Sequence, residues 1–414
     1  MNRRDFLRQM ALGSLFGMLK PEQVWATRIP PPGEPPLQRL IVIFLRGGID
    51  GLNVVMPYEE EEYFEQRPTL ALPAPGKPDG ALKLDDRFAL HPALAPLLPF
   101  WQEKSLAFVH AAGLADGIRS HFAAQATLES GLGGHASAVD GWMNRLLGSL
   151  PGTGYPTRAV SVGGSTLPLI LSGPNPVANQ AFGPAAERVQ PSELPAVASV
   201  FDALYAGQDE LGKAYLEGKM ARQRLVADLR EDMQAADRDA PHPQRFPDET
   251  RKLAQLVRGE SRVQLAFIAL GGWDTHIGQG GVTGPLAHKL RPLGDGLAQL
   301  IRGLGTDYAH TTLLLLSEFG RTVAENGNGG TDHGHGNVIC LLGGGIKGGK
   351  VYGQWPGLAT EALFEHRDLA VTTDYRDILW QALRHRFGLQ APALSHILPD
   401  FTPSRDGLPG LFPT

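Results

Sequence analysis

Residues 40–50 read LIVIFLRGGID, a run of six apolar residues that ends in a glycine-rich turn and an aspartate. A continuous apolar run of this length is typical of a parallel strand that is covered on both faces. The same pattern recurs in SLAFVHAAG (105–113), RAVSVGG (158–164), VQLAFIALGG (263–272), TTLLLLSEFG (311–320) and NVICLLGGG (337–345). Helical stretches separate several of these runs. The sequence therefore predicts an α/β fold with a mainly parallel central sheet flanked by helices.

Residues 192–260 show a different pattern. SELPAVASVFDALYAG and GKAYLEGKMARQRLVADLREDMQAADRD carry apolar residues at a spacing of three to four, which is typical of amphipathic helices. We interpret this segment as a helical insertion or cap within one α/β domain that covers residues 39–414.

The composition excludes some classes of protein. Hydrophobic residues make up 42% of the chain and charged residues 20%, as in soluble globular proteins. The net charge of −5 gives no sign of nucleic-acid binding, which would show as clustered lysine and arginine. Cys340 is the only cysteine, so it has no internal disulfide partner, and we expect it to be a small core residue.

The first 26 residues resemble a twin-arginine export signal. Arg3 and Arg4 precede the short apolar stretch MALGSLFGML, and a small-residue cleavage site ends at Ala26. The alternative is an amphipathic helix of the mature fold. The apolar stretch is too short to span a bilayer, and no later stretch replaces it, so no integral span is expected in the mature form. We predict a proline-rich linker over residues 27–38, the twin-arginine export machinery as a partner, and a periplasmic or secreted location.

Acidic and imidazole side chains follow the predicted strands. Ligands of open α/β sheets bind outside the carboxyl ends of the strands, so these positions are the candidate site. They are Asp50, His110, Asp274, His276, Glu318, Asp332, His333 and His335. Each alone has an ordinary explanation, as a helix cap or a hydrogen-bonded loop histidine. Together they suit zinc, manganese or iron, while oxygen-rich subsets suit magnesium or calcium.

The loop GNGGTDHGHGN (327–337) packs one aspartate and two histidines among glycines. It is either part of a metal site or a flexible loop that is rich in histidine. We expect it to contribute at least one metal ligand. For His335, exposure to solvent remains the alternative.

The stretch GIRSHFAAQATLESG (117–131) predicts a helix that begins near Ser120. Ser120 is either an ordinary N-cap or a nucleophile placed at a helix N-terminus, where free N–H groups favour negative charge. Arg119 beside it is a candidate clamp for an oxyanion. Arg46 and Arg321 are further candidates, because a planar guanidinium pairs well with such groups.

The order of Asp50, SHFAAQATLESG, WDTH (273–276), SEFGRT (317–322) and TDHGHGN (331–337) resembles the alkaline phosphatase and sulfatase superfamily. More narrowly, it resembles a branch of twin-arginine-exported proteins that is labelled only as a domain of unknown function. The resemblance covers nearly the whole mature chain, and it implies an alkaline-phosphatase-like fold with two divalent metals. These would be zinc, manganese, calcium or magnesium.

The resemblance also implies roles for individual residues. Asp50 would bind one metal, while Asp274 and His276 would bind the other. His333 matches the final histidine of the superfamily.

Two positions depart from the superfamily pattern. Phe319 stands where a second ligand is expected after Glu318, and Asp332 and His335 are the candidates to replace it. His121 falls at the nucleophile position, with Ser120 one residue earlier. Three outcomes follow: Ser120 reaches into the site, His121 is itself a nucleophile or ligand, or covalent chemistry has been lost.

The predicted function is that of an exported metal-dependent hydrolase of phosphate or sulfate esters, either small or polymer-borne. The alternative is a non-catalytic binding or assembly protein that keeps the fold and one structural metal. A redox metalloprotein is disfavoured, because the sequence has no cysteine cluster and no haem-type motif.

Overall fold

The computed structural model describes residues 36–133, 138–152, 156–164, 166–180, 236–238, 240–259, 262–404 and 408–413. The predicted signal peptide, the linker up to residue 35 and residues 192–235 of the predicted insertion lie outside the described residues. Within the described ranges, no helix is long and apolar enough to cross a membrane.

A nine-stranded sheet forms the centre of the described structure, in the order β11-β5-β10-β9-β1-β8-β6-β7, with β12 also paired to β5. The strands are β1 (Arg39–Leu45), β5 (Leu106–Gly113), β6 (Ala159–Val162), β7 (Ala178–Gln180), β8 (Leu265–Leu270), β9 (Thr311–Leu316), β10 (Asn337–Gly343), β11 (Lys350–Tyr352) and β12 (Thr373–Asp374). All six predicted strands are present. The pairings are parallel except those of β10, which is antiparallel to β5 and β9. The prediction of a mainly parallel α/β sheet is confirmed.

The reversed direction of β10 has a consequence for the loop that precedes it. Strand β9 ends at the carboxyl edge of the sheet, and β10 begins at that edge and runs back. Residues 317–336 therefore stay at the carboxyl edge. They lie close to the ends of β1 and β8, because the sheet has the order β9-β1-β8 and these three strands are parallel.

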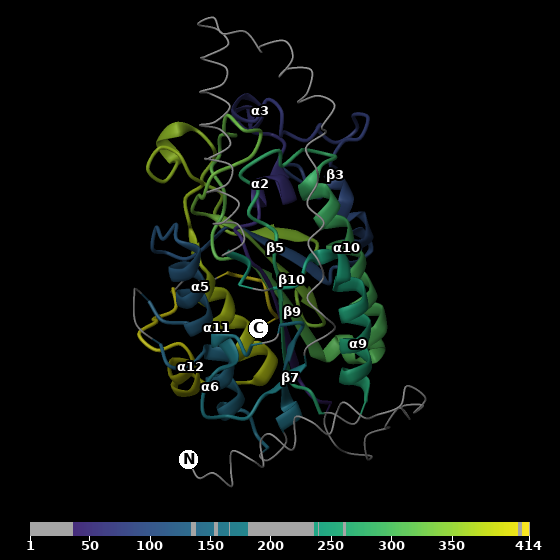
Figure 1. The fold of residues 1–414 in the computed structure, drawn as a ribbon, viewed down its shortest axis with the longest axis vertical. Coiled ribbons are helices and arrows are strands. Elements are labelled where there is room, and N and C mark those ends of the chain that lie inside the picture. Colours follow the sequence, from purple (N-terminus) through teal and green to yellow (C-terminus); the bar gives the residue numbers. More distant parts are fainter. Residues whose placement is uncertain are drawn as a thin grey trace, which may run out of the picture.

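Helices cover both faces of the sheet, which makes three layers (Figure 1). On one face lie α5 (His121–Ser130), α6 (Trp142–Ser149), α11 (Tyr375–Phe387) and α12 (Ala391–Ile397). On the other lie η2 (Pro92–Leu97), α4 (Leu98–Gln102), α9 (Phe246–Arg258) and α10 (Pro285–Leu304). Short 3-10 helices connect them: η3 (Pro156–Arg158), η4 (Leu169–Leu171), η5 (Pro243–Arg245), η6 (Gly305–His310) and η7 (Thr360–Ala362).

Strand β1 shows why a continuous apolar run predicts a strand covered on both faces. Leu40, Val42 and Phe44 belong to the core shared with α5 and α6, whereas Ile41 and Ile43 belong to the core shared with α9 and α10. Successive side chains of a strand point to opposite faces, so both faces of β1 are buried.

The described part of the predicted insertion includes α9. This helix packs against α10 and contributes Phe246, Leu253 and Val257 to the core. It is therefore part of the layer that covers the sheet.

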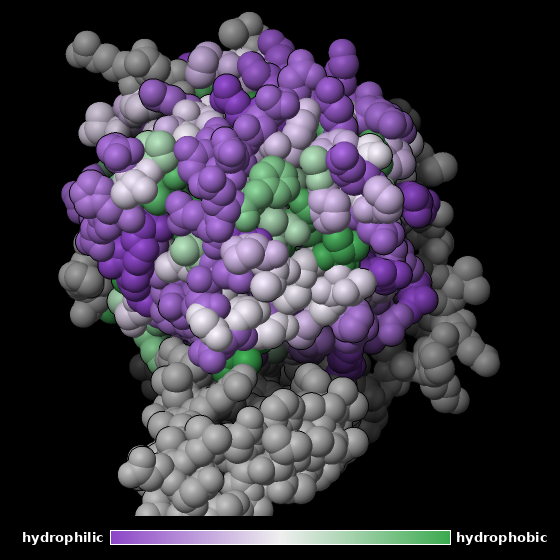
Figure 2. All heavy atoms as spheres, turned by 90° about the horizontal axis from the view of Figure 1, so that it is seen from above, coloured by the Kyte–Doolittle hydropathy of each residue, from purple (hydrophilic) through white to green (hydrophobic). Residues whose placement is uncertain are grey.

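A second, three-stranded antiparallel sheet and two short helices lie next to the carboxyl edge. They are β2 (Val55–Pro57), β3 (Leu82–Lys83), β4 (Phe88–Leu90), α2 (Gly51–Val54) and α3 (Glu61–Gln66). Figure 2 looks onto the end of the molecule at which α2 and α3 lie in Figure 1, and it shows apolar side chains gathered near the middle of a mostly polar face. Because α2 directly follows β1, this is the end to which the carboxyl edge points.

Candidate metal centre

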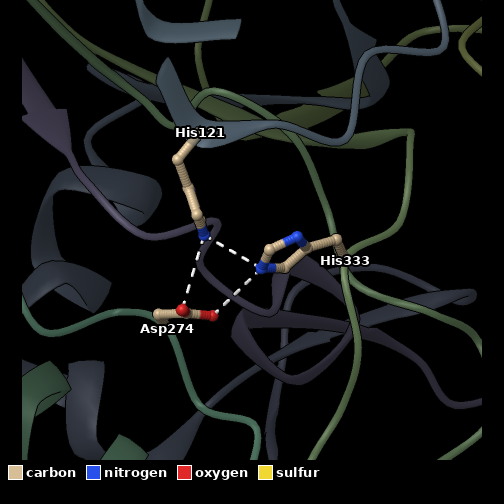
Figure 3. A group of neighbouring side chains, drawn as sticks. All are labelled: His121, Asp274 and His333. Carbon is tan, nitrogen blue, oxygen red and sulfur yellow. Dashed lines mark hydrogen bonds and ion pairs between the residues drawn. The ribbon is translucent and has the colours of Figure 1, made fainter. Parts of the chain in front are cut away.

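Three side chains from distant parts of the sequence meet at the carboxyl edge: His121, Asp274 and His333 (Figure 3). His121 is the first residue of α5, Asp274 follows β8, and His333 lies on the connection from β9 to β10. Nε2 of His121 lies 2.9 Å from Nε2 of His333 and 3.4 Å from Oδ2 of Asp274. Nε2 of His333 lies 3.4 Å from Oδ1 of Asp274. We call these residues the His121–Asp274–His333 cluster.

Hydrogen bonds at the far side of each ring fix how the two imidazoles face the cluster. Nδ1 of His121 donates to Oε1 of Glu318 over 2.7 Å, and Nδ1 of His333 donates to the backbone carbonyl of Arg119 over 2.9 Å. A carbonyl and an ionised carboxylate can only accept, so both Nδ1 atoms carry hydrogen. In the neutral rings, the two Nε2 lone pairs face each other and need a cation or a proton between them.

In the metal-free chain a proton takes this position. Burial alone would lower the pKa of His121, but hydrogen bonds to Asp274 and Glu318 raise it to about 9. Burial lowers the pKa of His333, so that ring is the acceptor. A metal ion that binds here therefore displaces a proton, as is usual for imidazole ligands.

Asp274 contributes a carboxylate that is 1% exposed. Oδ1 accepts a hydrogen bond from Arg321 and lies 3.0 Å from Nε2 of His276. Oδ2 is buried, and it is engaged only weakly by the described residues, through Nε2 of His121 at 3.4 Å. Burial alone would raise the pKa of Asp274, but Arg321 and the neighbouring histidines hold it well below its usual range. The weakly engaged oxygen of this ionised carboxylate suits a cation.

His276 adds a third imidazole at the border of the cluster. Its Nε2 lies 3.0 Å from both Nε2 of His333 and Oδ1 of Asp274. Its Nδ1 lies 3.1 Å from Oδ1 of Asp332, whose pKa falls to about 2, chiefly through the hydrogen bond to His276. Asp332 is itself largely exposed, and it orients His276 from behind.

This donor set fits one divalent ion. Imidazole nitrogens and one carboxylate oxygen, each ring held by an acceptor on its other nitrogen, are typical ligands of zinc and related metals. The prediction that the TDHGHGN loop supplies a ligand agrees with the position of His333. Two metal ions were expected from the resemblance; the described residues bring one such cluster together.

Glu318 lies behind His121. Its carboxylate is fully buried and accepts hydrogen bonds from the backbone of Gly47 (2.8 Å) and from Nε2 of Gln125 (3.0 Å), besides the one from His121. Burial alone would raise the pKa of Glu318, but the bond to His121 leads the effects that lower it to about 2. Glu318, which was predicted as a ligand, thus holds the ring of His121 from behind. Gln125 was not predicted, although it stands four residues after His121 on one face of α5.

Asp50, predicted as a ligand, has other partners. Oδ2 accepts hydrogen bonds of 2.6 Å from both Arg67 and Gln279, whereas the buried Oδ1 has no hydrogen-bond partner among the described residues. Oε1 of Gln279 accepts in turn from the hydroxyls of Thr275 (2.6 Å) and Thr331 (3.0 Å). Asp50 therefore braces the two segments that carry the ligands.

Two predicted histidines also lie apart from the cluster. His335 is 4% exposed, so it does not face solvent, and its ring stacks on Phe364 at 4.2 Å. His110 lies inside β5, which continues to Gly113, and Nε2 of His110 donates to the carbonyl of Val55 over 2.9 Å.

The residues predicted around the nucleophile occupy the N-terminus of α5. Ser120 is exposed at the N-cap, and its hydroxyl makes no capping hydrogen bond among the described residues. Each of the three candidate anion clamps is paired with a carboxylate. These pairs are Arg46–Glu129, Arg119–Asp368 with Glu365, and Arg321–Asp274.

Phe319 fills the position where the superfamily pattern expects a second ligand. Its ring is 1% exposed and lies 4.8 Å from the ring of His121 and 4.9 Å from that of His333. Phe319 therefore forms an apolar wall beside the cluster.

Two solved structures show weak similarity to this chain. The C-terminal periplasmic domain of EcEptC from Escherichia coli, in complex with Zn, is 8% identical with a TM-score of 0.38, over 75% of this chain and 77% of that chain. Ps i-CgsB in complex with k-i-k-neocarrahexaose is 11% identical with a TM-score of 0.39, over 77% of this chain and 68% of that chain. None of the curated proteins compared with this chain matches it.

A comparison with models of protein families gives a match over most of the chain. The match extends over residues 37–398, from the start of β1 to the end of α12, and so includes the whole cluster. The expectation that the chain belongs to a family labelled only as a domain of unknown function is confirmed: the chain belongs to the family described as "Protein of unknown function (DUF1501)".

Proposed function

We propose that this chain is an exported, metal-dependent hydrolase of phosphate or sulfate esters. One observation carries the proposal: two imidazoles and a buried carboxylate oxygen meet at the carboxyl edge of the sheet, and each imidazole is held from behind by an acceptor. Ligands of α/β sheets bind at this edge. The order of motifs along the chain supports a place in the alkaline phosphatase and sulfatase superfamily.

A bound divalent ion would supply Lewis-acid chemistry that polarises an ester oxygen. The chain's own residues prepare its ligands. Glu318 keeps Nε2 of His121 free of hydrogen in the neutral ring, and Arg321 keeps the carboxylate of Asp274 ionised. Phe319 places an apolar ring against both imidazoles.

Ser120 is the better candidate for the attacking group. Both ring nitrogens of His121 are engaged, one by Glu318 and the other by the cluster, which favours a ligand role for His121. The hydroxyl of Ser120 is exposed at the start of a ten-residue helix, where free N–H groups favour developing negative charge.

A specific observation favours the second candidate, a non-catalytic binding or assembly protein with one metal. The guanidinium groups of Arg46, Arg119 and Arg321 are all paired with carboxylates. At the His121–Asp274–His333 cluster, none of the three therefore brings an unpaired charge to an ester oxyanion, which leaves that task to the metal.

Elemental analysis of the purified mature chain first tests the metal centre that both candidates share. We expect about one divalent ion per chain, and its loss in Asp274→Ala and His333→Ala. His396→Ala is the matched control, because His396 is exposed on α12, away from the cluster. Unchanged metal content in both cluster variants would refute the metal centre.

Activity is then tested with aryl phosphate and aryl sulfate esters, with and without a chelator. Chelator-sensitive turnover that disappears in Asp274→Ala supports the hydrolase. Turnover that survives Asp274→Ala contradicts it, and metal binding without turnover of any ester favours the binding protein.

Export through the twin-arginine pathway forms a separate part of the proposal. It rests on Arg3 and Arg4 within residues 1–26, which lie outside the described residues. Replacement of both arginines by lysine should leave the full-length chain in the cytoplasm, as measured by fractionation of the expressing cells. Export that continues at the same level would contradict this part.

A further inference from the structure

A cavity separate from the metal centre opens on the α5 side of the sheet, at the carboxyl ends of β1, β8 and β6. Its volume is about 180 Å³. The described residues that line it include Arg46, Glu129, Phe267 and Arg238. None of them belongs to the His121–Asp274–His333 cluster, and of these four residues the sequence analysis named Arg46, as a candidate clamp for an oxyanion.

The charges around this cavity do not cancel. Nη2 of Arg46 donates to Oε1 of Glu129 over 2.7 Å, and Oε2 of Glu129 accepts from the backbone of Ile170 over 3.2 Å. That pair is neutral as a unit. Arg238 has no hydrogen bond or ion pair within the described ranges; its guanidinium lies over the ring of Phe122, 4.9 Å from the centroid. The described lining therefore carries two arginines and one carboxylate, and Arg238 is attracted through space by Glu129 and Glu318 without a direct ion pair.

The buried arginine also has an unused donor. Arg46 is 5% exposed, and its Nε has no hydrogen-bond partner in the part of the chain that the structure describes. A buried N–H without a partner is costly, so such a group marks a position where a ligand can bind. Apolar walls such as Phe267 and Ala269 lower the local dielectric and strengthen the attraction for an anion.

We propose that this cavity binds a singly charged oxyanion, a carboxylate or a sulfate-ester group of an acidic ligand, between Arg46 and Arg238. The lining has one more arginine than carboxylate, which matches one negative charge, and a guanidinium fork pairs with two oxygens of either group. A doubly charged phosphate would leave one negative charge unbalanced in a partly desolvated site.

The position of the cavity relative to the metal centre limits the ligand. Glu129 stands eight residues after His121 on α5, and at a rise of 1.5 Å per residue this separates them by roughly 12 Å. Arg238, which lines the cavity, lies over the ring of Phe122, the residue next to His121 at the start of α5. A ligand that reaches both is longer than a simple ester. The inference does not depend on the hydrolase proposal, because it concerns binding alone.

The test uses the mature chain after treatment with a chelator, so that no anion can bind through a metal. Sodium acetate and sodium methyl sulfate serve as probes, with sodium chloride at equal ionic strength as the reference. The midpoint of thermal unfolding reports binding, because a ligand of the native state raises it. Calorimetric titration gives the dissociation constant. We expect at least one probe to stabilise the chain beyond the effect of chloride.

Arg238→Gln should weaken that binding by about tenfold or more, as expected for the loss of a charge-assisted hydrogen-bond pair. Arg238→Lys keeps the charge and loses the fork, so it should bind with intermediate affinity. Arg87→Gln is the matched control, because Arg87 is exposed in a distant turn and the charge change is the same. The proposal is overturned if the wild type, Arg238→Gln and Arg238→Lys bind the probes with equal dissociation constants. It is also overturned if neither probe raises the unfolding midpoint more than chloride does. Stronger binding of acetate indicates a carboxylate ligand, and stronger binding of methyl sulfate indicates a sulfate ester.

Discussion

The imidazole of His121 donates a 2.7 Å hydrogen bond from Nδ1 to Oε1 of Glu318, and both side chains are buried. These residues are 197 positions apart in the sequence. Their contact decides which ring nitrogen of His121 faces Asp274 and His333, and hence whether the ring can serve as a metal ligand.

Glu318→Gln tests this role. The amide can donate to Nδ1, which moves the ring hydrogen to Nε2 and blocks the lone pair that faces the cluster. We expect metal affinity to fall by about 10- to 100-fold, as for other residues that orient metal ligands. Competition with a chromophoric chelator measures the affinity. Glu103→Gln is the control, because Glu103 is exposed after α4. An affinity equal to that of the wild type would show that Glu318 does not orient the ligand.

Asp50→Asn distinguishes a bracing residue from a ligand. The variant leaves Arg67 buried without its ionic partner, and such a loss costs about 3 kcal/mol of unfolding free energy. Metal content of the folded, metal-saturated protein should stay unchanged. Urea unfolding and elemental analysis check both expectations.

The matched control for Asp50→Asn is Asp86→Asn, which breaks the exposed pair of Asp86 with Lys83 and should leave stability unchanged. Loss of bound metal from folded Asp50→Asn, without loss of stability, would instead make Asp50 a ligand.

Ser120→Ala tests the attacking group. The hydroxyl is exposed and makes no capping bond within the described residues, so we expect stability to change by no more than about 0.5 kcal/mol. Ester turnover should fall by at least about 100-fold with metal content unchanged. Ser395→Ala, on the exposed side of α12, is the control. Full turnover in Ser120→Ala would exclude a covalent role for Ser120.

His110 should make stability depend on pH in acid. Burial lowers the pKa of His110 from its ordinary value of 6.5 to about 4. Between these values the unfolded chain binds more protons than the native chain, so native stability falls as the pH drops through this window. The expected loss at pH 4, relative to pH 7, is roughly 3 kcal/mol from this residue.

Urea unfolding at a series of pH values measures the effect of His110. The His110→Gln variant should show a shallower decline of unfolding free energy between pH 6.5 and 4, whatever its stability at neutral pH. A part of the decline should remain, because burial also lowers the pKa of His91 to about 4. His396→Gln, an exposed control, should keep the wild-type slope. An unaltered slope in His110→Gln would show that His110 does not titrate across the transition.

The local pattern of apolar residues in the sequence was enough to predict the strands and the sheet edge at which the candidate site lies. Each predicted strand is a run of apolar residues whose burial on both faces is a property of its own sequence, as β1 shows. Polar residues that directly follow such a run must lie at a strand end. Asp274, Glu318 and His333 were therefore expected at the carboxyl edge, where the structure has them.

The roles of those residues were harder to predict, because the resemblance assigns ligands by order along the chain. Phe319 indicated that the superfamily pattern is altered next to Glu318. It did not indicate that His121 and Glu318 form one unit, with the carboxylate behind the ring.

The sequence by itself determined which segments are buried strands, which edge of the sheet collects acid and imidazole groups, and the family to which the chain belongs. Only the tertiary structure decided which of those groups bind one another. Asp50 is neutralised by Arg67, and Arg46 by Glu129, 83 positions away. Hydrophobic periodicity is local along the chain, whereas the partner of a buried charge is selected by distance in space. That partner decides whether a carboxylate or an imidazole remains free to bind a metal.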